Sequence, residues 1–115
     1  MTALPVAIAP TRIDVRAATS TGGCTIAVSG EIDATTAPGL RSSLLEVLGR
    51  PGVDAVEVDL TGVTFLDSAG LSALATAHRA AEAAGHTLQM RVGNTRAVVR
   101  PLEITGLWDV FTVVG

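Results

Sequence analysis

"TFLDSAGL", residues 64–71, joins two segments whose hydrophobic patterns differ. Before it, "DAVEVDL" (54–60) alternates apolar and acidic residues, as a strand with one buried face does. After it, residues 68–84 are rich in Ala and Leu and are followed by a glycine, which is a typical helix stop. The stretch is therefore predicted to be a strand-to-helix junction, with Asp67 and Ser68 where the helix begins.

The rest of the chain also alternates between the two patterns. Strand-like segments are 12–17, 24–30, 54–60, 87–92 and an apolar tail at 107–114, and helix-like segments are 37–48, 68–84 and a short one around 98–102. "TGG" (21–23) is a turn signal between the first two strands, which predicts a hairpin. Thr35 or Thr36 is a candidate cap for the first helix, with Pro38 in its first turn. Pro101 predicts that the last helix is irregular or begins there.

Strands that alternate with helices predict an α/β domain. Strands buried on both faces are continuously apolar, whereas here Glu57, Asp59, Gln89 and Arg91 occupy the second face of two strands. The sequence therefore predicts a single domain with a small mixed sheet of four or five strands. The helices are expected to cover mainly one face of that sheet, and water the other.

Composition narrows the possible partners and surroundings. The chain has 115 residues, 48% of them apolar and 17% charged, with a net charge of -3 and no basic stripe. With 3% aromatic residues and no Tyr, it lacks the features of a nucleic-acid-binding surface. No apolar run approaches the ~18 residues of a membrane span, so neither nucleic acid nor membrane is expected as a partner.

The N-terminus and the single cysteine suggest where the protein works. Residues 1–10 contain two prolines and no basic region of the kind that starts a signal peptide, so they are predicted to be a flexible leader before a domain at 11–115. Cys24 has no second cysteine to pair with and lies in an apolar segment, which favours a buried thiol in a reduced compartment. A cytoplasmic location is therefore predicted.

Most kinds of catalytic site are disfavoured by the sequence. A nucleophile elbow around Ser68 would need glycine on both sides, and although Gly70 is present, Leu66 takes the first glycine position. His78 and His86 are predicted to be surface residues rather than partners of Ser68. Phosphate-binding glycine motifs are absent, and the chain has no lysine to serve them. With one cysteine, two histidines and no clustered carboxylates, no metal site is expected.

Asp67 and Ser68 remain open to more than one interpretation on local grounds. Both residue types cap helices, because their side-chain oxygens accept a hydrogen bond from an otherwise unpaired N–H. A serine at a helix start beside small residues is also accessible to another enzyme. A phosphate placed there would lie at the positive end of the helix.

A comparison of longer motifs favours the interpretation in which another enzyme modifies Ser68. "VSGEIDATTAP" (28–38) and "VDLTGVTFLDSAGLSAL" (58–74) strongly resemble the bacterial anti-sigma factor antagonists, which belong to the STAS-domain family. That family has a G-E-[LI]-D loop and a D-S-[SA]-G-L junction, and the resemblance spans roughly residues 12 to 114. It implies that the domain at 11–115 is a STAS domain. This chain has Ala69 where many relatives have a second serine.

The resemblance implies a partner-switching role in transcription regulation rather than an enzyme. Unphosphorylated protein would bind a cognate anti-sigma factor, a histidine-kinase-like serine kinase, and thereby free a sigma factor. The kinase would phosphorylate Ser68 and end the binding, and a phosphatase would remove the phosphate. ATP and Mg²⁺ would belong to the kinase, so no cofactor is expected for this chain.

The expected binding surface combines the loop after the second strand with the start of the 68–84 helix, because loops gather at strand ends in α/β sheets. The candidate partner-binding residues are Asp33, Thr35, Thr36, Asp67, Ser68, Ala69 and Gly70. A bulky residue in place of Gly70 is expected to abolish binding and to leave the fold intact. Two alternatives are a STAS subunit that regulates a transporter complex and, with less support, a nucleotide-binding or nucleotide-hydrolysing enzyme.

Overall fold

The first described element is an antiparallel hairpin in a computed structural model that describes residues 13–114. Strand β1 (Ile13–Ser20) pairs with β2 (Gly23–Ile32) along its whole length. Gly22, in the two-residue turn, has a φ of 74°, which glycine adopts without strain. The predicted hairpin is confirmed. The predicted leader at residues 1–10 lies outside the described residues, and the domain boundary at residue 11 stays a prediction.

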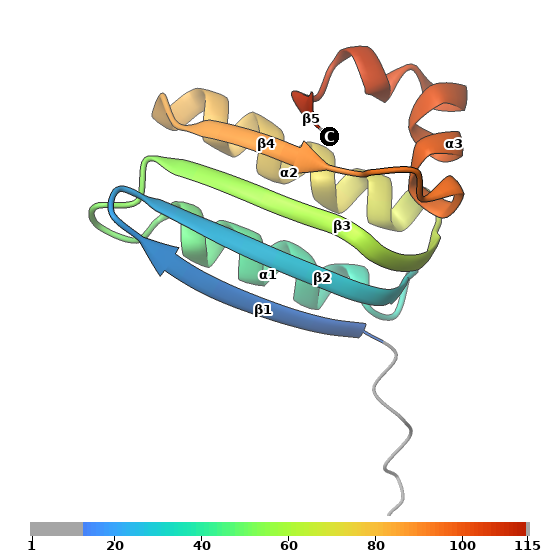
Figure 1. Cartoon of the computed structure of the whole chain (residues 1–115), viewed down its shortest axis with the longest axis horizontal. Helices are drawn as coiled ribbons and strands as arrows, with labels where there is room; N and C mark the ends of the chain where they lie inside the picture. Colours follow the sequence, from blue (N-terminus) through green and yellow to red (C-terminus); the bar gives the residue numbers. More distant parts are fainter. Residues whose placement is uncertain (1–12, 115) are drawn as a thin grey trace, which may run out of the picture.

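The five strands lie in the sheet in their sequence order, β1-β2-β3-β4-β5. The remaining elements are α1 (Ala37–Leu48), β3 (Ala55–Leu66), α2 (Ser68–Ala84), β4 (Thr87–Arg91), α3 (Arg96–Thr105), the 3-10 turn η1 (Leu107–Asp109) and β5 (Val113–Val114). Strands β2 to β5 are parallel, and each of their connections crosses over through a helical segment. In Figure 1, α1 and α2 lie behind the sheet and α3 lies at the end where β3 finishes. The predicted mixed sheet with helices mainly on one face is confirmed.

The core lies between the sheet and the helices. Alternate residues of β2 and β3 face α1 and α2. Buried leucine and alanine side chains of the two helices pack against them. Side chains that are at most 1% exposed include Ile26, Ile32, Leu40, Leu44, Val58, Leu60, Leu74 and Met90. Cys24 is buried in the same core, as predicted. The junction between β3 and α2, which contains Asp67 and Ser68, therefore connects two elements that pack firmly in the core.

Helix α3 corrects one expectation. It runs from residue 96 to 105 with Pro101 inside it, whereas the sequence predicted irregular structure or a helix start at the proline. Proline lacks an N–H, so the helix loses a backbone hydrogen bond at that turn. Val98 and Leu102, one helical turn apart, are both fully buried. The burial of this pair offsets the lost hydrogen bond, and α3 packs against the end of β3.

The histidines also differ from expectation. The side chain of His78, in α2, is only 12% exposed, and its ring centroid lies 5.4 Å from that of Phe111. His78 Nε2 lies 3.5 Å from the carboxylate of Glu82. His86 is half-buried. The prediction of two surface histidines is therefore wrong for His78, because the returning segment at Phe111 covers it.

Within residues 13–114, no three metal-ligating side chains gather in one place. None of the described helices combines the length and the hydropathy that crossing a bilayer would need.

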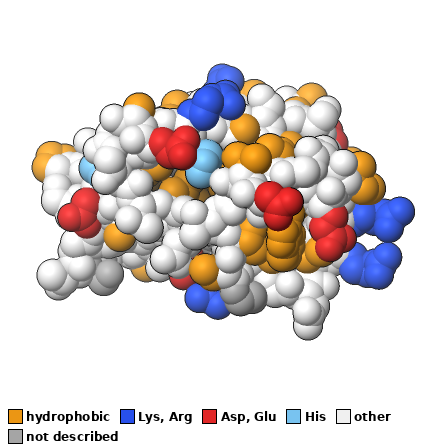
Figure 2. All heavy atoms as spheres, turned by 90° about the horizontal axis from the view of Figure 1, so that it is seen from above, with side chains coloured by type: hydrophobic (Ala, Val, Ile, Leu, Met, Phe, Trp, Pro, Cys, Tyr) orange, Lys and Arg blue, Asp and Glu red, His pale blue; other side chains and the backbone are white. Residues whose placement is uncertain are grey.

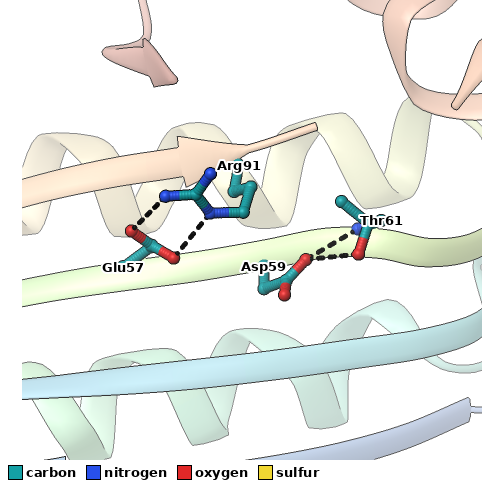
Figure 3. A network of polar contacts seen from close by, with 4 residues as sticks. All are labelled: Glu57, Asp59, Thr61 and Arg91. Atoms are coloured by element: carbon teal, nitrogen blue, oxygen red, sulfur yellow. Dashed lines mark hydrogen bonds and ion pairs between the residues drawn. The ribbon is translucent and has the colours of Figure 1, made fainter. Parts of the chain in front are cut away.

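The uncovered face of the sheet carries the polar residues that the alternation predicted. Glu57 on β3 and Arg91 on β4 form an ion pair, with Arg91 Nε 3.0 Å from Glu57 Oε2 (Figure 3). Both side chains and that of Gln89 are half-buried, and α1 and α2 lie on the opposite face. Asp59 on the same face accepts hydrogen bonds from the hydroxyl and the N–H of Thr61, at 2.7 and 3.0 Å.

The Thr61 hydroxyl, helped by its N–H and by the charge of Arg91, lowers the pKa of Asp59 below its usual value. A carboxylate with a lowered folded-state pKa stabilises the fold above pH 4, roughly, and that stabilisation disappears as the pH falls through the folded pKa. We expect Thr61→Val to raise the pKa of Asp59 and to make unfolding less dependent on pH in this acid range. Carboxyl NMR titration measures this, with Thr64→Val on the same strand as the matched control. An unchanged Asp59 titration in Thr61→Val would contradict the assigned cause.

Candidate functional site

Asp67 and Ser68 have different positions and contacts at the start of α2. Asp67 is the N-cap: its backbone is extended, and its Oδ1 accepts hydrogen bonds from the N–H groups of Ala69 and Gly70, at 3.0 and 3.2 Å. Ser68 is the first helical residue and is exposed. Its hydroxyl forms no hydrogen bond with any residue between 13 and 114. Of these two residues, Asp67 therefore does the capping, and the Ser68 hydroxyl points to no partner within the described residues.

The loop after β2 is held by its own side chains. Asp33 Oδ1 accepts hydrogen bonds from the N–H groups of Thr35 and Thr36, at 2.9 and 3.1 Å. The Thr36 hydroxyl accepts from the Asp33 N–H at 2.9 Å and donates to the Glu31 carbonyl at 2.8 Å. Thr36 occupies the N-cap position of α1, but its side chain makes no capping bond there. The hydroxyl instead fixes the loop, and Thr35 is left exposed.

The structure brings this loop and the start of α2 together. The Asp67 N–H donates to the Ile32 carbonyl at 3.2 Å, which joins the carboxyl ends of β2 and β3. A hollow of about 210 Å³ lies between the two helix starts. Its lining residues are Ala34, Ala37, Pro38, Arg41, Ala69, Ser72 and Ala73. The predicted site residues thus lie at one edge of the sheet, as expected for loops that follow parallel strands.

Gly70 is the exception among the predicted surface residues, because it is buried. A Cβ atom added to it would overlap Leu66 Cδ1 and lie 2.6 Å from Ile32 Cγ2. Its absent side chain lets α2 pack closely on the ends of β2 and β3. The expectation that a bulky residue here would spare the fold is therefore wrong.

A larger groove, which the sequence did not predict, lies on the other side of Ser68. It has a volume of about 510 Å³ and runs between the end of β3, the start of α2 and helix α3. Its lining residues are Thr64, Phe65, Leu66, Asp67, Ser68, Leu71, Arg96, Ala97, Arg100, Pro101, Ile104 and Thr105. Phe65 is 49% exposed and Ile104 is 71% exposed, which is unusual for large apolar residues. Figure 2 shows hydrophobic side chains gathered toward an end of the molecule that also carries acidic and basic ones.

One signal in the sequence could have indicated this groove. Val98 and Leu102 define the buried side of α3, and Ile104 lies off that side by the helical repeat. An isoleucine on the solvent side of an amphipathic helix is a candidate contact for another molecule. The partner of Ile104 across the groove, Phe65, was not foreseeable, because it comes from a distant part of the chain.

Comparison with known proteins agrees with this geometry. Residues 15–114 match the family model described as "Mlab, STAS domain". The match covers most of the chain, and the chain belongs to the STAS domain family.

Individual relatives are more specific. The anti-sigma-F factor antagonist RsfB of Mycobacterium tuberculosis is 34% identical over 104 residues, covering 90% of this chain and 82% of the relative. The anti-sigma-B factor antagonist of Listeria monocytogenes is 34% identical over 88 residues, covering 76% and 75% of the two chains. A crystal structure of an anti-sigma factor antagonist from Mycobacterium paratuberculosis superposes with a TM-score of 0.76 at 31% identity, covering 91% of this chain and 87% of that one. Within the STAS family, the chain therefore groups with the anti-sigma factor antagonists.

Proposed function

We propose that this protein binds a cognate anti-sigma factor, through the edge of the sheet around Ser68, and thereby frees a sigma factor for transcription. The observation that carries the proposal is the exposed Ser68 hydroxyl, which has no hydrogen-bond partner in residues 13–114 and lies between two hollows. The names of the relatives support the class of partner. The contact surface consists of the Asp33–Thr36 loop, the start of α2 and the 510 Å³ groove.

The proposed switch is phosphorylation of Ser68 by the anti-sigma factor acting as a serine kinase. The Ser68 oxygen attacks the γ-phosphorus of ATP, the bond from that phosphorus to ADP breaks, and the hydroxyl proton passes to a base of the kinase. ATP and Mg²⁺ are brought by the kinase, and a phosphatase later hydrolyses the phosphoserine. This chain then acts in the cytoplasm as a substrate and binding module, and its role requires no catalysis of its own.

A pull-down from native lysate followed by a phosphorylation assay tests the proposal. Unmodified protein is expected to recover a kinase-like anti-sigma factor, identified by mass spectrometry. With ATP and Mg²⁺, that partner should add one phosphate to the wild type and none to Ser68→Ala. Ser42→Ala, an exposed serine of α1 that lines neither hollow, is the matched control and should accept the phosphate normally.

Two results would count against this function. Phosphorylation of Ser68→Ala at the wild-type rate would place the modified residue elsewhere. Recovery of a transport ATPase without any kinase-like protein would favour the alternative, in which the chain is a regulatory subunit of a transporter complex.

A further inference from the structure

Two arginines of α3 share the groove with Ser68. Arg96 and Arg100 both line it, and their spacing of four residues places them on one face of the helix. Both are exposed, and neither forms an ion pair or a hydrogen bond within the described part of the chain. Arginines that line a largely apolar groove and form no ion pair there are available to bind an anion.

The core fixes the position of helix α3, which carries these two arginines. Val98 and Leu102, on the other side of α3, are fully buried. The Thr95 hydroxyl, just before the helix, donates to the Thr61 carbonyl of β3 at 3.1 Å. Helix α3 is therefore held against the strand that leads into Ser68, as Figure 1 shows for the two elements. The backbone that carries the two arginines therefore has a fixed place beside the groove.

Other charged side chains also lie near Ser68. Asp67 lies next to it and lines the same groove, and Asp33 lies in the neighbouring loop. Arg41 of α1 lines the smaller hollow on the far side of the α2 start. The two carboxylates would repel a phosphate on Ser68, so the arginines supply the attraction that the immediate surroundings lack.

We propose that Arg96 and Arg100 form a binding site for a phosphomonoester, and that its ligand is the phosphate on Ser68. The proposal rests on the proposed function in that the phosphate must be added there. A phosphoserine carries about -1.5 to -2 charges and three acceptor oxygens near neutral pH. Guanidinium groups match such oxygens with two N–H donors each. Once paired, the phosphate and the two arginines occupy part of the groove that Phe65 and Ile104 also line.

This pairing has a consequence for the switch. In the unphosphorylated protein, the groove offers a partner an apolar floor and two unpaired cations. In the phosphorylated protein, both cations are occupied from within the chain. The modification therefore removes attractive groups from the surface as well as adding a charge to it.

The test is a ³¹P NMR titration of protein that carries phosphoserine at position 68, incorporated during translation. Nearby cations stabilise the dianion, so the second pKa of the phosphate is expected to rise by about 0.5 in the double variant Arg96→Gln, Arg100→Gln. The Lys variants at both positions should restore most of the effect. Arg79→Gln, an exposed arginine about three turns away on α2, is the matched control and should titrate like the wild type.

The NMR titration needs neither the kinase nor the anti-sigma factor. It can therefore fail independently of the proposed function, which is tested by separate binding measurements. A double variant that titrates like the wild type overturns the phosphate site, even if the phosphorylated protein still loses its partner. If the same variant then also weakens binding of the unphosphorylated protein, the arginines contact the partner instead. A raised pKa in the double variant supports the site, whether or not phosphorylation changes partner binding.

Discussion

Ser68→Asp is expected to unfold at the wild-type temperature and to bind the anti-sigma factor at least a hundredfold more weakly. Phosphorylated wild type should behave in the same way. Because Ser68 is exposed at the centre of the proposed surface, a charge placed there is pressed against the partner. Removing a charge from water at an interface costs several kcal/mol per ion. Each 1.4 kcal/mol, roughly, is a factor of ten in affinity, so a hundredfold loss needs only part of that cost.

The fold should tolerate the same change. The Ser68 hydroxyl forms no hydrogen bond in the described structure, so its replacement breaks none. A negative charge in the first turn of α2 interacts favourably with the helix dipole, by about 0.3–1 kcal/mol, while Asp67 opposes it. These contributions largely cancel, so the melting temperature should hardly move.

Isothermal titration calorimetry with the purified anti-sigma factor measures the affinity, and thermal unfolding measures the melting temperature. Ser68→Ala should bind like the wild type. Thr87→Asp is the control for added charge, because this exposed residue begins β4 at the opposite end of the sheet. Wild-type affinity in both Ser68→Asp and the phosphorylated protein would show that Ser68 lies outside the interface.

Gly70→Ala is expected to destabilise the fold by about 1–3 kcal/mol, the usual range for overpacking a core. The added methyl would overlap the end of Leu66 and approach Ile32, whose branched side chain adjusts poorly. Leu66 and Ile32 end the two strands that carry the site. The damage should therefore reach the start of α2 as well as the overall stability.

Gly39→Ala provides a closely matched control for this prediction. Gly39 and Gly70 are each the third residue of a helix, and a Cβ at Gly39 meets nothing within 4 Å. Alanine there should be neutral or stabilising, by up to about 1 kcal/mol, through its better helix propensity. Urea unfolding of both variants measures the difference. Equal effects would mean that the close packing at Gly70 carries no energetic weight.

The sequence predicted the parts of the structure that depend on neighbouring residues. Alternation in 54–60 and the Ala-rich run of 68–84 gave the correct element types, and the second gave the correct bounds. Local chemistry also marked Asp67 as a cap. What it could not settle was which of Asp67 and Ser68 does the capping, because both side chains are suited to it.

Errors arose where distant segments meet. The local effect of Pro101 predicts a break in the helix, yet burial of Val98 and Leu102 by the rest of the chain outweighs that effect. The sequence does not predict that Gly70 is buried, because its burial depends on Ile32, far back in the sequence. The groove was missed for the same reason, since its two walls come from β3 and α3.

The order of the strands has a consequence for how the protein comes into being on the ribosome. Strands β1 to β5 lie side by side in the order of their synthesis, so each new strand can add to an edge that already exists. Ser68 precedes α3 in the chain, so it leaves the ribosome before α3 does. In the nascent chain, Ser68 is therefore outside the ribosome for a time before the second wall of the groove has joined it.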